Sequence, residues 1–173
     1  MKKMFNIIHE RLNAGEALVL VTVTASSGAT PRGPGARMLV AKEGRVYGTI
    51  GGGAVEYRSE QIALQVLANK SSEKQDFSLT RDDVQNLGMI CGGDVHVFFQ
   101  YIPEGDIDTI RLSAEALRRL DAGDALWLIS NIGKSGELSL YTKKYGLYGA
   151  EVSDWVFTQL PRQPKVLQNR DET

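Results

Sequence analysis

The spacing of hydrophobic residues predicts alternating helices and strands along the chain. Phe5, Ile8 and Leu12 recur at helical intervals before a small-residue stop, which predicts a helix over residues 3–13. The apolar, β-branched run of residues 17–24 follows almost without a polar interruption. A run of this kind is typical of a strand that is buried on both faces.

The same analysis predicts the remaining elements and the fold class. Strands are expected over residues 37–41, 45–50, 73–79 and 95–101, helices over 54–69, 107–120 and 152–160, and a hairpin over 125–129 and 138–142. A capping-box pattern from Thr80 to Asp83 predicts a further short helix that ends at Gly88. Helices alternate with strands while the hairpins require antiparallel pairs, so we predict an α/β or α+β fold with a mixed β-sheet flanked by helices.

Length and composition favour one compact domain with a small addition. The chain has 173 residues, of which 42% are hydrophobic and 24% charged, as in ordinary globular proteins. A Pro-Glu-Gly boundary at residues 103–105 predicts a main domain over 1–103 and a C-terminal helix plus β-hairpin extension over 104–165. A loose polar tail is expected over 166–173.

Charge and cysteine content exclude several classes of function. The net charge of −1 gives no global basic field, so we expect no nucleic-acid partner. The longest apolar run, residues 17–21, is too short to cross a membrane, and we expect a cytoplasmic protein. One cysteine excludes an internal disulfide, and one cysteine with two histidines cannot fill a four-ligand structural zinc site.

A glycine-rich stretch with interspersed arginines predicts an anion-binding cradle. Eight of the 18 glycines fall within residues 28–53, together with Arg32 and Arg37. Glycine allows backbone N–H groups to approach a ligand, and guanidinium groups beside them hold phosphate or similar anions. Three glycines at 51–53 immediately precede the predicted helix at residue 54. They either present the free N–H groups of the helix to an anion or only form a tight turn, and Glu56 either complements the helix dipole or contacts the ligand.

The lone cysteine lies in a second glycine-rich turn. Gly88, Gly92 and Gly93 flank Cys91 closely, just before a predicted strand. A lone cysteine is often a small buried hydrophobe, but the flanking glycines open the backbone around this sulfur, and both interpretations stay open. We expect His96, in the following strand, to be a surface or packing residue rather than a ligand.

Several short motifs in one order give these features a family context. They are Gly-Ala-Thr-Pro-Arg at 28–32, Gly-Ala-Arg-Met at 35–38, Gly-Thr-Ile-Gly-Gly-Gly at 48–53, Val-Glu at 55–56 and Cys-Gly-Gly at 91–93. Together they resemble the amino-terminal domain of the XdhC/CoxI family, maturation factors for molybdenum hydroxylases such as xanthine dehydrogenase and CO dehydrogenase. The resemblance covers about residues 4–102 and lacks the family's carboxy-terminal Rossmann-like domain. Some relatives carry Cys or His where this chain has Ala54.

The resemblance implies a ligand and a set of binding residues. It implies that the molybdenum cofactor is bound transiently as cargo, sulfurated and inserted into a xanthine dehydrogenase-type or CO dehydrogenase-type enzyme. The arginines and glycine N–H groups would take phosphate or pterin oxygens, and Cys91 would approach the molybdenum or its sulfur. The implied binding residues are Thr30, Arg32, Gly35, Arg37, Gly51, Gly52, Gly53, Glu56, Cys91, Gly92 and Gly93.

The implied partners are the client molybdenum hydroxylase, a cysteine desulfurase and a second copy of the chain in a homodimer, with no membrane. On this basis the main hypothesis is a non-catalytic cofactor chaperone. Two alternatives stay open. One is a sulfurtransferase that depends on Cys91, and the other is a regulator that binds a nucleotide or phosphate metabolite in the same cradle.

Overall fold

The structure is a computed structural model that describes residues 1–27, 32–79, 93–132, 136–163 and 166–167. Its elements in chain order are α1 (Lys2–Asn13), β1 (Leu18–Ser26), β2 (Arg37–Ala41), β3 (Gly44–Gly48), α2 (Gly53–Asn69), β4 (Glu73–Leu79), β5 (Gly93–Ile102), α4 (Ile107–Asp121), β6 (Trp127–Ser130), β7 (Leu138–Thr142), β8 (Gly146–Gly149) and α5 (Asp154–Thr158). The predicted elements are confirmed within a few residues, apart from the helix expected after Thr80, which lies outside the described residues. Strand β8 is an addition that no pattern indicated.

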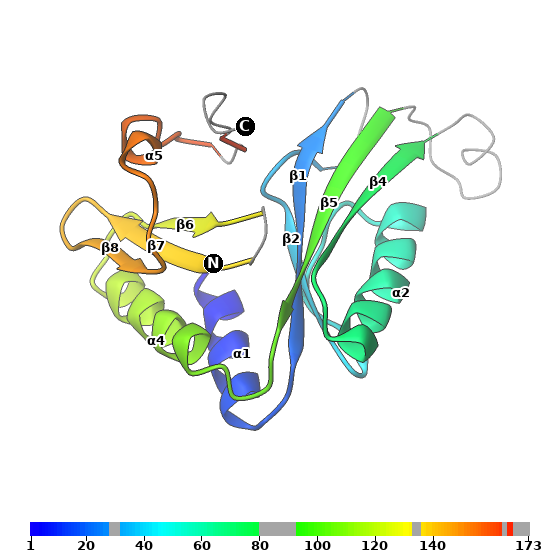
Figure 1. The fold of residues 1–173 in the computed structure, drawn as a ribbon, viewed down its shortest axis with the longest axis horizontal. Coiled ribbons are helices and arrows are strands. Elements are labelled where there is room, and N and C mark those ends of the chain that lie inside the picture. The colour runs from blue at the N-terminus through cyan, green and yellow to red at the C-terminus, as the bar shows by residue number, and fades with distance from the viewer. Residues whose placement is uncertain (28–31, 80–92, 133–135, 164–165, 168–173) are drawn as a thin grey trace.

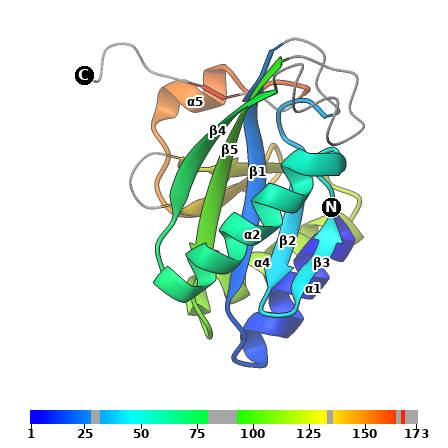
Figure 2. The same cartoon turned by 90° about the vertical axis from the view of Figure 1, so that its right-hand side faces the viewer.

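Five strands form sheet A in the order β3-β2-β1-β5-β4, and three form sheet B in the order β6-β7-β8. Every strand pair in the described parts of the chain is antiparallel, which confirms the α+β alternative of the predicted class. Helix α2 covers one face of sheet A, and α1 lies on the opposite face (Figures 1 and 2). None of the helices in these described parts combines the length and hydropathy that a bilayer crossing needs.

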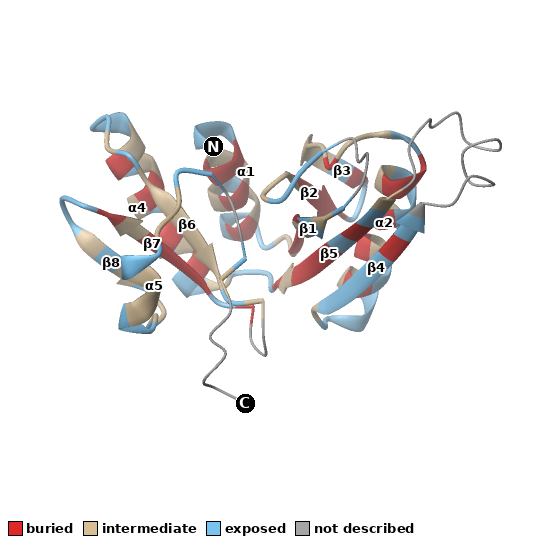
Figure 3. Cartoon of the chain, turned by 90° about the horizontal axis from the view of Figure 1, so that it is seen from above, coloured by how far each residue is buried: buried red, intermediate tan, exposed pale blue. Residues whose placement is uncertain are grey.

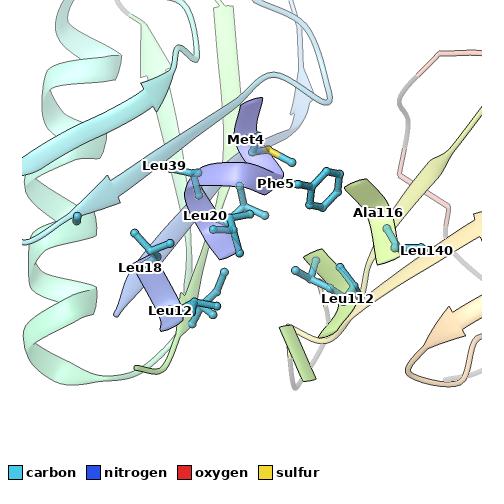
Figure 4. Close-up of a cluster of buried hydrophobic side chains, with 13 residues drawn as sticks. Met4, Phe5, Leu12, Leu18, Leu20, Leu39, Leu112, Ala116 and Leu140 are labelled. Atoms are coloured by element: carbon cyan, nitrogen blue, oxygen red, sulfur yellow. The ribbon is translucent and has the colours of Figure 1, made fainter. Parts of the chain in front are cut away.

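Strand β1 is buried on both faces, as its continuous apolar sequence predicted. Val19, Val21 and Val23 belong to a core between sheet A and α2. Leu18 and Leu20 belong to a second core that contains α1 and α4 (Figure 4). Because successive side chains of a strand point to opposite faces, one short strand supplies the centre of both cores.

The C-terminal helix and hairpin share this second core. Leu112 and Ala116 of α4 pack with Leu138 and Leu140 of β7 in the same cluster as α1. In Figure 3 helices α1 and α4 lie side by side, and sheet B packs against α4. Residues beyond the predicted boundary at residue 103 therefore stabilise the main sheet through a continuous core.

The segment that leads into β7 changes the environment of β5. Its sequence predicted one core face, formed by alternate residues from Val95 to Tyr101. The structure also buries Phe98 and Gln100 on the other face. The Gln100 side-chain amide donates a hydrogen bond to the backbone oxygen of Gly136, in the segment that leads into β7. The second face is buried because a chain segment distant in sequence covers it.

Candidate functional site

The segments that carry the predicted site residues meet at one end of sheet A. We call this the glycine end; β1, β3 and β4 finish there at Ser26, Gly48 and Leu79, and β2 and β5 begin there at Arg37 and Gly93. Residues Ser27 and Asp94 exchange backbone hydrogen bonds of 2.9 and 3.2 Å, which extend the β1–β5 ladder beyond the strand ends. The glycine end is at the top of sheet A in Figure 1.

Gly48 lets the chain turn from β3 toward α2. Its φ of +75° is in the left-handed region, and a Cβ atom there would lie 2.2 Å from the Arg37 backbone oxygen. That same oxygen accepts a hydrogen bond of 3.1 Å from the backbone N–H of Thr49. Glycine is therefore required at this position both by the backbone conformation and by the close approach of β2.

The carboxylate of Glu56 fills the turn that precedes α2. Its Oε2 atom accepts hydrogen bonds of 3.1 Å from the backbone N–H groups of Ile50 and Gly52, and one from the hydroxyl of Thr49. Its Oε1 atom is 3.2 Å from Nη1 of Arg45. These groups of the turn are thus occupied within the chain, as in a capping interaction at a helix N-terminus.

The surroundings of Glu56 favour its ionised form. Burial raises the pKa of this carboxyl group, but the hydrogen bonds from Thr49, Gly52 and Ile50 and the charge of Arg45 outweigh that effect. The net result is a pKa below the ordinary value, because each hydrogen bond donates to the carboxylate. Arg45 is itself fixed, since its Nη1 atom also donates to the Gly48 backbone oxygen at 2.9 Å. The turn is consequently rigid and electrically balanced.

Arg37 differs from Arg45 in having no acidic partner. It begins β2 opposite Thr22 of β1, on the face of sheet A that carries Leu39 and the core shared with α1. The side chain is half-buried, its Nε atom is enclosed without a hydrogen-bond partner, and no described residue forms an ion pair with it. Burial lowers the pKa of Arg37 from its ordinary value, because a guanidinium ion loses solvation there. An anion placed at this arginine would supply the missing counter-charge.

The other predicted residues are distributed around the same end. Gly35 has a φ of +86° and donates a backbone hydrogen bond of 2.8 Å to the Val23 oxygen, which holds the segment before β2 against β1. Arg32 is exposed, and Gly93 pairs with Leu79. The structure therefore brings together Gly35, Arg37, Gly51, Gly52, Gly53, Glu56 and Gly93 at the glycine end. Thr30, Cys91 and Gly92 lie outside the described residues.

A polar cluster on β4 and β5 was not foreseen. Nδ1 of His96 is 2.6 Å from a carboxylate oxygen of Asp76, directly across the strand pair. The Asp94 carboxylate accepts hydrogen bonds from the hydroxyls of Ser27 at 3.3 Å and Ser78 at 2.9 Å. The period-two alternation of these strands was the available signal, but register cannot be read from one strand alone. His96 is exposed, in agreement with its expected surface position.

Two further observations concern ligand binding in general. Within the described residues no group of three or more His, Cys, Asp or Glu side chains could hold a metal ion.

A shallow hollow of about 390 Å³ at the start of α2 is lined by Gly53, Ala54, Tyr57 and Arg58. Tyr57 is 67% exposed, which leaves its ring accessible from the hollow.

Comparisons with known proteins support the family resemblance and the fold. Residues 11–78 match the XdhC and CoxI family. The chain is also 35% identical over 79 residues to "Uncharacterized protein YqeB" of Escherichia coli (strain K12), a match that covers 46% of this chain and 14% of that protein. A crystal structure described as a xanthine dehydrogenase from Bacillus halodurans superposes with a TM-score of 0.66 at 17% identity, over 93% of this chain and 49% of the other.

These matches define which part of the chain carries the likeness. The family segment begins in α1 and ends in β4, so it contains Arg37, the glycine turn and Glu56, but not Cys91. The structural match extends over nearly the whole chain and supports its fold. This chain spans about half of the solved structure and a seventh of the curated relative.

Proposed function

Because residues 11–78 of the chain belong to the XdhC and CoxI family, we propose that the protein is an accessory protein of a molybdenum hydroxylase of the xanthine dehydrogenase or CO dehydrogenase type. In this proposal it binds the molybdenum cofactor as cargo and assists its sulfuration and its insertion into the client enzyme. A cysteine desulfurase and a second copy of this chain are partners in the same proposal.

Arg37 is the observation that supports the binding of an anionic cargo. Its Nε atom is enclosed without a partner, and no described acid neutralises it. A buried charge without a counter-ion costs stability, whereas a guanidinium facing a phosphate forms two parallel charge-assisted hydrogen bonds. The phosphate of a pterin cofactor is the complement that this arrangement lacks.

The glycine turn has a different part in the proposed site. Since Glu56 already accepts from the backbone of Ile50 and Gly52, these donors are occupied without the cargo. The turn instead fixes Thr49 against Arg37, and so holds the beginning of β2 in place. We assign Arg37 to direct contact with the cofactor and Glu56 to positioning.

The test is anaerobic binding of purified molybdenum cofactor to the parent protein and to Arg37→Met, quantified by pterin fluorescence after oxidation. Loss of a charge-assisted contact of about 1.5–3 kcal/mol should weaken binding by about ten- to a hundredfold. Arg111→Met, which removes an exposed arginine from α4, is the matched control and should bind like the parent.

The outcomes separate the proposal from its alternatives. Equal binding by the parent and Arg37→Met would remove Arg37 from the site. If the parent binds no cofactor but binds adenosine triphosphate through Arg37, the nucleotide-binding alternative replaces the chaperone. Protein that binds neither ligand would contradict an anion site at Arg37 altogether.

A further inference from the structure

The turn between β7 and β8 presents an exposed aromatic ring among basic side chains. We call this surface the Tyr145 patch; it consists of Arg118 of α4 with Lys143, Lys144, Tyr145 and Leu147. Tyr145 is 41% exposed and Leu147 is 37% exposed. Large residues exposed together beside charged groups are typical of contact surfaces rather than of ordinary solvated turns.

The patch is held rigidly by the residue beneath it. Arg119 is 2% exposed and donates hydrogen bonds to Glu115 at 2.7 Å and to the Gly146 backbone oxygen at 2.9 Å, which ties the turn to α4. The backbone N–H of Tyr145 donates to the hydroxyl of the buried Thr142 at 3.1 Å. The patch is therefore preorganised, and a partner that binds it would not have to order the turn.

Basic groups surround the Tyr145 ring. The Arg118 guanidinium carbon and the Lys144 Nζ atom each lie 4.7 Å from the ring centroid, within the range of cation–π contacts. Hydrogen bonding to Lys144 and to Arg118 lowers the pKa of the Tyr145 phenol. Glu115 holds the Arg118 side chain in place through two hydrogen bonds of 2.7 Å.

The charges around the ring are not balanced within the chain. Arg118, Arg119 and Lys144 lie around the ring together with the carboxylates of Glu115 and Asp124, and the turn adds the exposed Lys143. Glu115 is shared between the two arginines, and the charge of Asp124 acts on Lys144, so these two carboxylates face a larger number of basic groups. The surface is locally positive and has an apolar centre.

We propose that the Tyr145 patch docks an acidic segment of a partner protein. Carboxylates of that segment meet Lys143, Lys144 and the outer edge of Arg118, while an apolar side chain packs on Tyr145 and Leu147. Tyrosine and arginine are the residue types that most often dominate interface energies. A nucleic acid would need a longer basic stripe than this single turn provides, because its affinity depends on neutralising several phosphates.

The location makes this surface independent of the glycine end. In Figure 1 the β7–β8 turn lies at the outer margin of sheet B, whereas α2 and the glycine end belong to the opposite half of the molecule. A partner on the Tyr145 patch would leave the glycine end uncovered. The docking proposal therefore stands or falls separately from the proposed binding of cofactor at Arg37.

The test uses fluorescence anisotropy with a fluorescein-labelled octapeptide of glutamates around one central leucine as the acidic probe. Lys143→Glu/Lys144→Glu should weaken binding at least about tenfold, because two attractive charges become repulsive. Tyr145→Ala should weaken it by about three- to tenfold without any change of net charge. Circular dichroism and the melting temperature confirm that each variant is folded.

Two controls distinguish a docking surface from general attraction. Lys3→Glu/Lys42→Glu makes the same change of net charge at exposed lysines elsewhere and should alter binding by less than about twofold. Equal weakening by both double variants, no effect of Tyr145→Ala, or no binding of the glutamate–leucine probe would overturn the proposal. Tighter, patch-dependent binding of a fluorescein-labelled oligothymidine octamer would assign the surface to phosphates and would also overturn it.

Discussion

Two arginines in the two halves of the molecule lose contact with water but differ in their partners, Arg119 being buried and Arg37 half-buried. Arg119, beneath sheet B, bonds to Glu115, to the Gly146 backbone oxygen and to the Thr142 hydroxyl. Arg37, at the glycine end of sheet A, has an enclosed Nε atom with no partner and no described acid. Both guanidinium groups lose water, but only one of them recovers its interactions within the chain.

This difference in partners suggests how to distinguish an arginine that stabilises the fold from one that binds a ligand. A buried arginine with carboxylate and carbonyl partners connects two elements, and its removal leaves those partners unsatisfied. A half-buried arginine whose enclosed Nε atom has no partner gains no hydrogen bond there to offset its lost solvation, so its presence suggests a ligand. Unfolding measurements on both sites test this distinction without any knowledge of the ligand.

The largest effect is expected at Arg119. Replacement by Met roughly keeps the volume of the side chain. It leaves the Gly146 backbone oxygen without its hydrogen-bond donor and removes the Arg119 hydrogen bond to Glu115. We expect the free energy of unfolding to fall by about 2–4 kcal/mol, as measured by urea denaturation. Arg118→Met also removes a hydrogen-bond donor to Glu115, but from an exposed position, and should cost much less. Equal losses in the two variants would contradict the anchoring role of Arg119.

The second-largest effect is expected in how the free energy of unfolding depends on pH, because the Glu115 carboxyl group titrates differently in the folded and unfolded protein. Hydrogen bonds from Arg118 and Arg119, against the opposing effect of burial, lower the pKa of this carboxyl group from 4.5 to about 2. A carboxyl whose pKa is lowered on folding stabilises the fold above pH 4.5, and this contribution disappears as the pH falls toward 2.

Glu115→Gln tests this contribution. Between pH 5 and pH 3 the parent should lose about 1–2 kcal/mol more of its free energy of unfolding than the variant does, because the glutamine cannot titrate. Urea denaturation at the two pH values gives the comparison. Parallel losses in the parent and the variant would mean that the ion pairs of Glu115 do not persist in solution.

The sequence predicted the elements of the fold better than their arrangement. The β-branched run of β1 and the apolar spacing of α1 are local signals, and both were confirmed. The burial of Phe98 and Gln100 depends on a hairpin more than 30 residues away, so no local pattern could indicate it. Strand β8 contains four residues with two glycines, and its pairing with β7 rather than its composition makes it a strand.

In the candidate site, too, the sequence predicted the segments better than the contacts between their side chains. Glycines and arginines in sequence predicted where an anion could bind, and the structure places several of those segments at one end of sheet A. Composition alone could not show that Glu56 satisfies the turn or that Arg45, rather than Arg37, pairs with it. Which charges remain unpaired is decided by side-chain geometry, and this is the property that bears on ligand binding.

The smallest effect, and the one of opposite sign, is expected at Arg37. Replacing this half-buried cation, which has no described acidic partner, by Met removes its desolvation cost and leaves an apolar side chain on the sheet face that carries Leu39. We expect Arg37→Met to leave the free energy of unfolding unchanged or to raise it by up to about 1 kcal/mol, in urea denaturation under the same conditions as Arg119→Met. A loss as large as that of Arg119→Met would show that Arg37 has structural partners in solution. A stable variant that no longer binds the cofactor would instead show that this arginine is kept at some cost in stability because it binds a ligand.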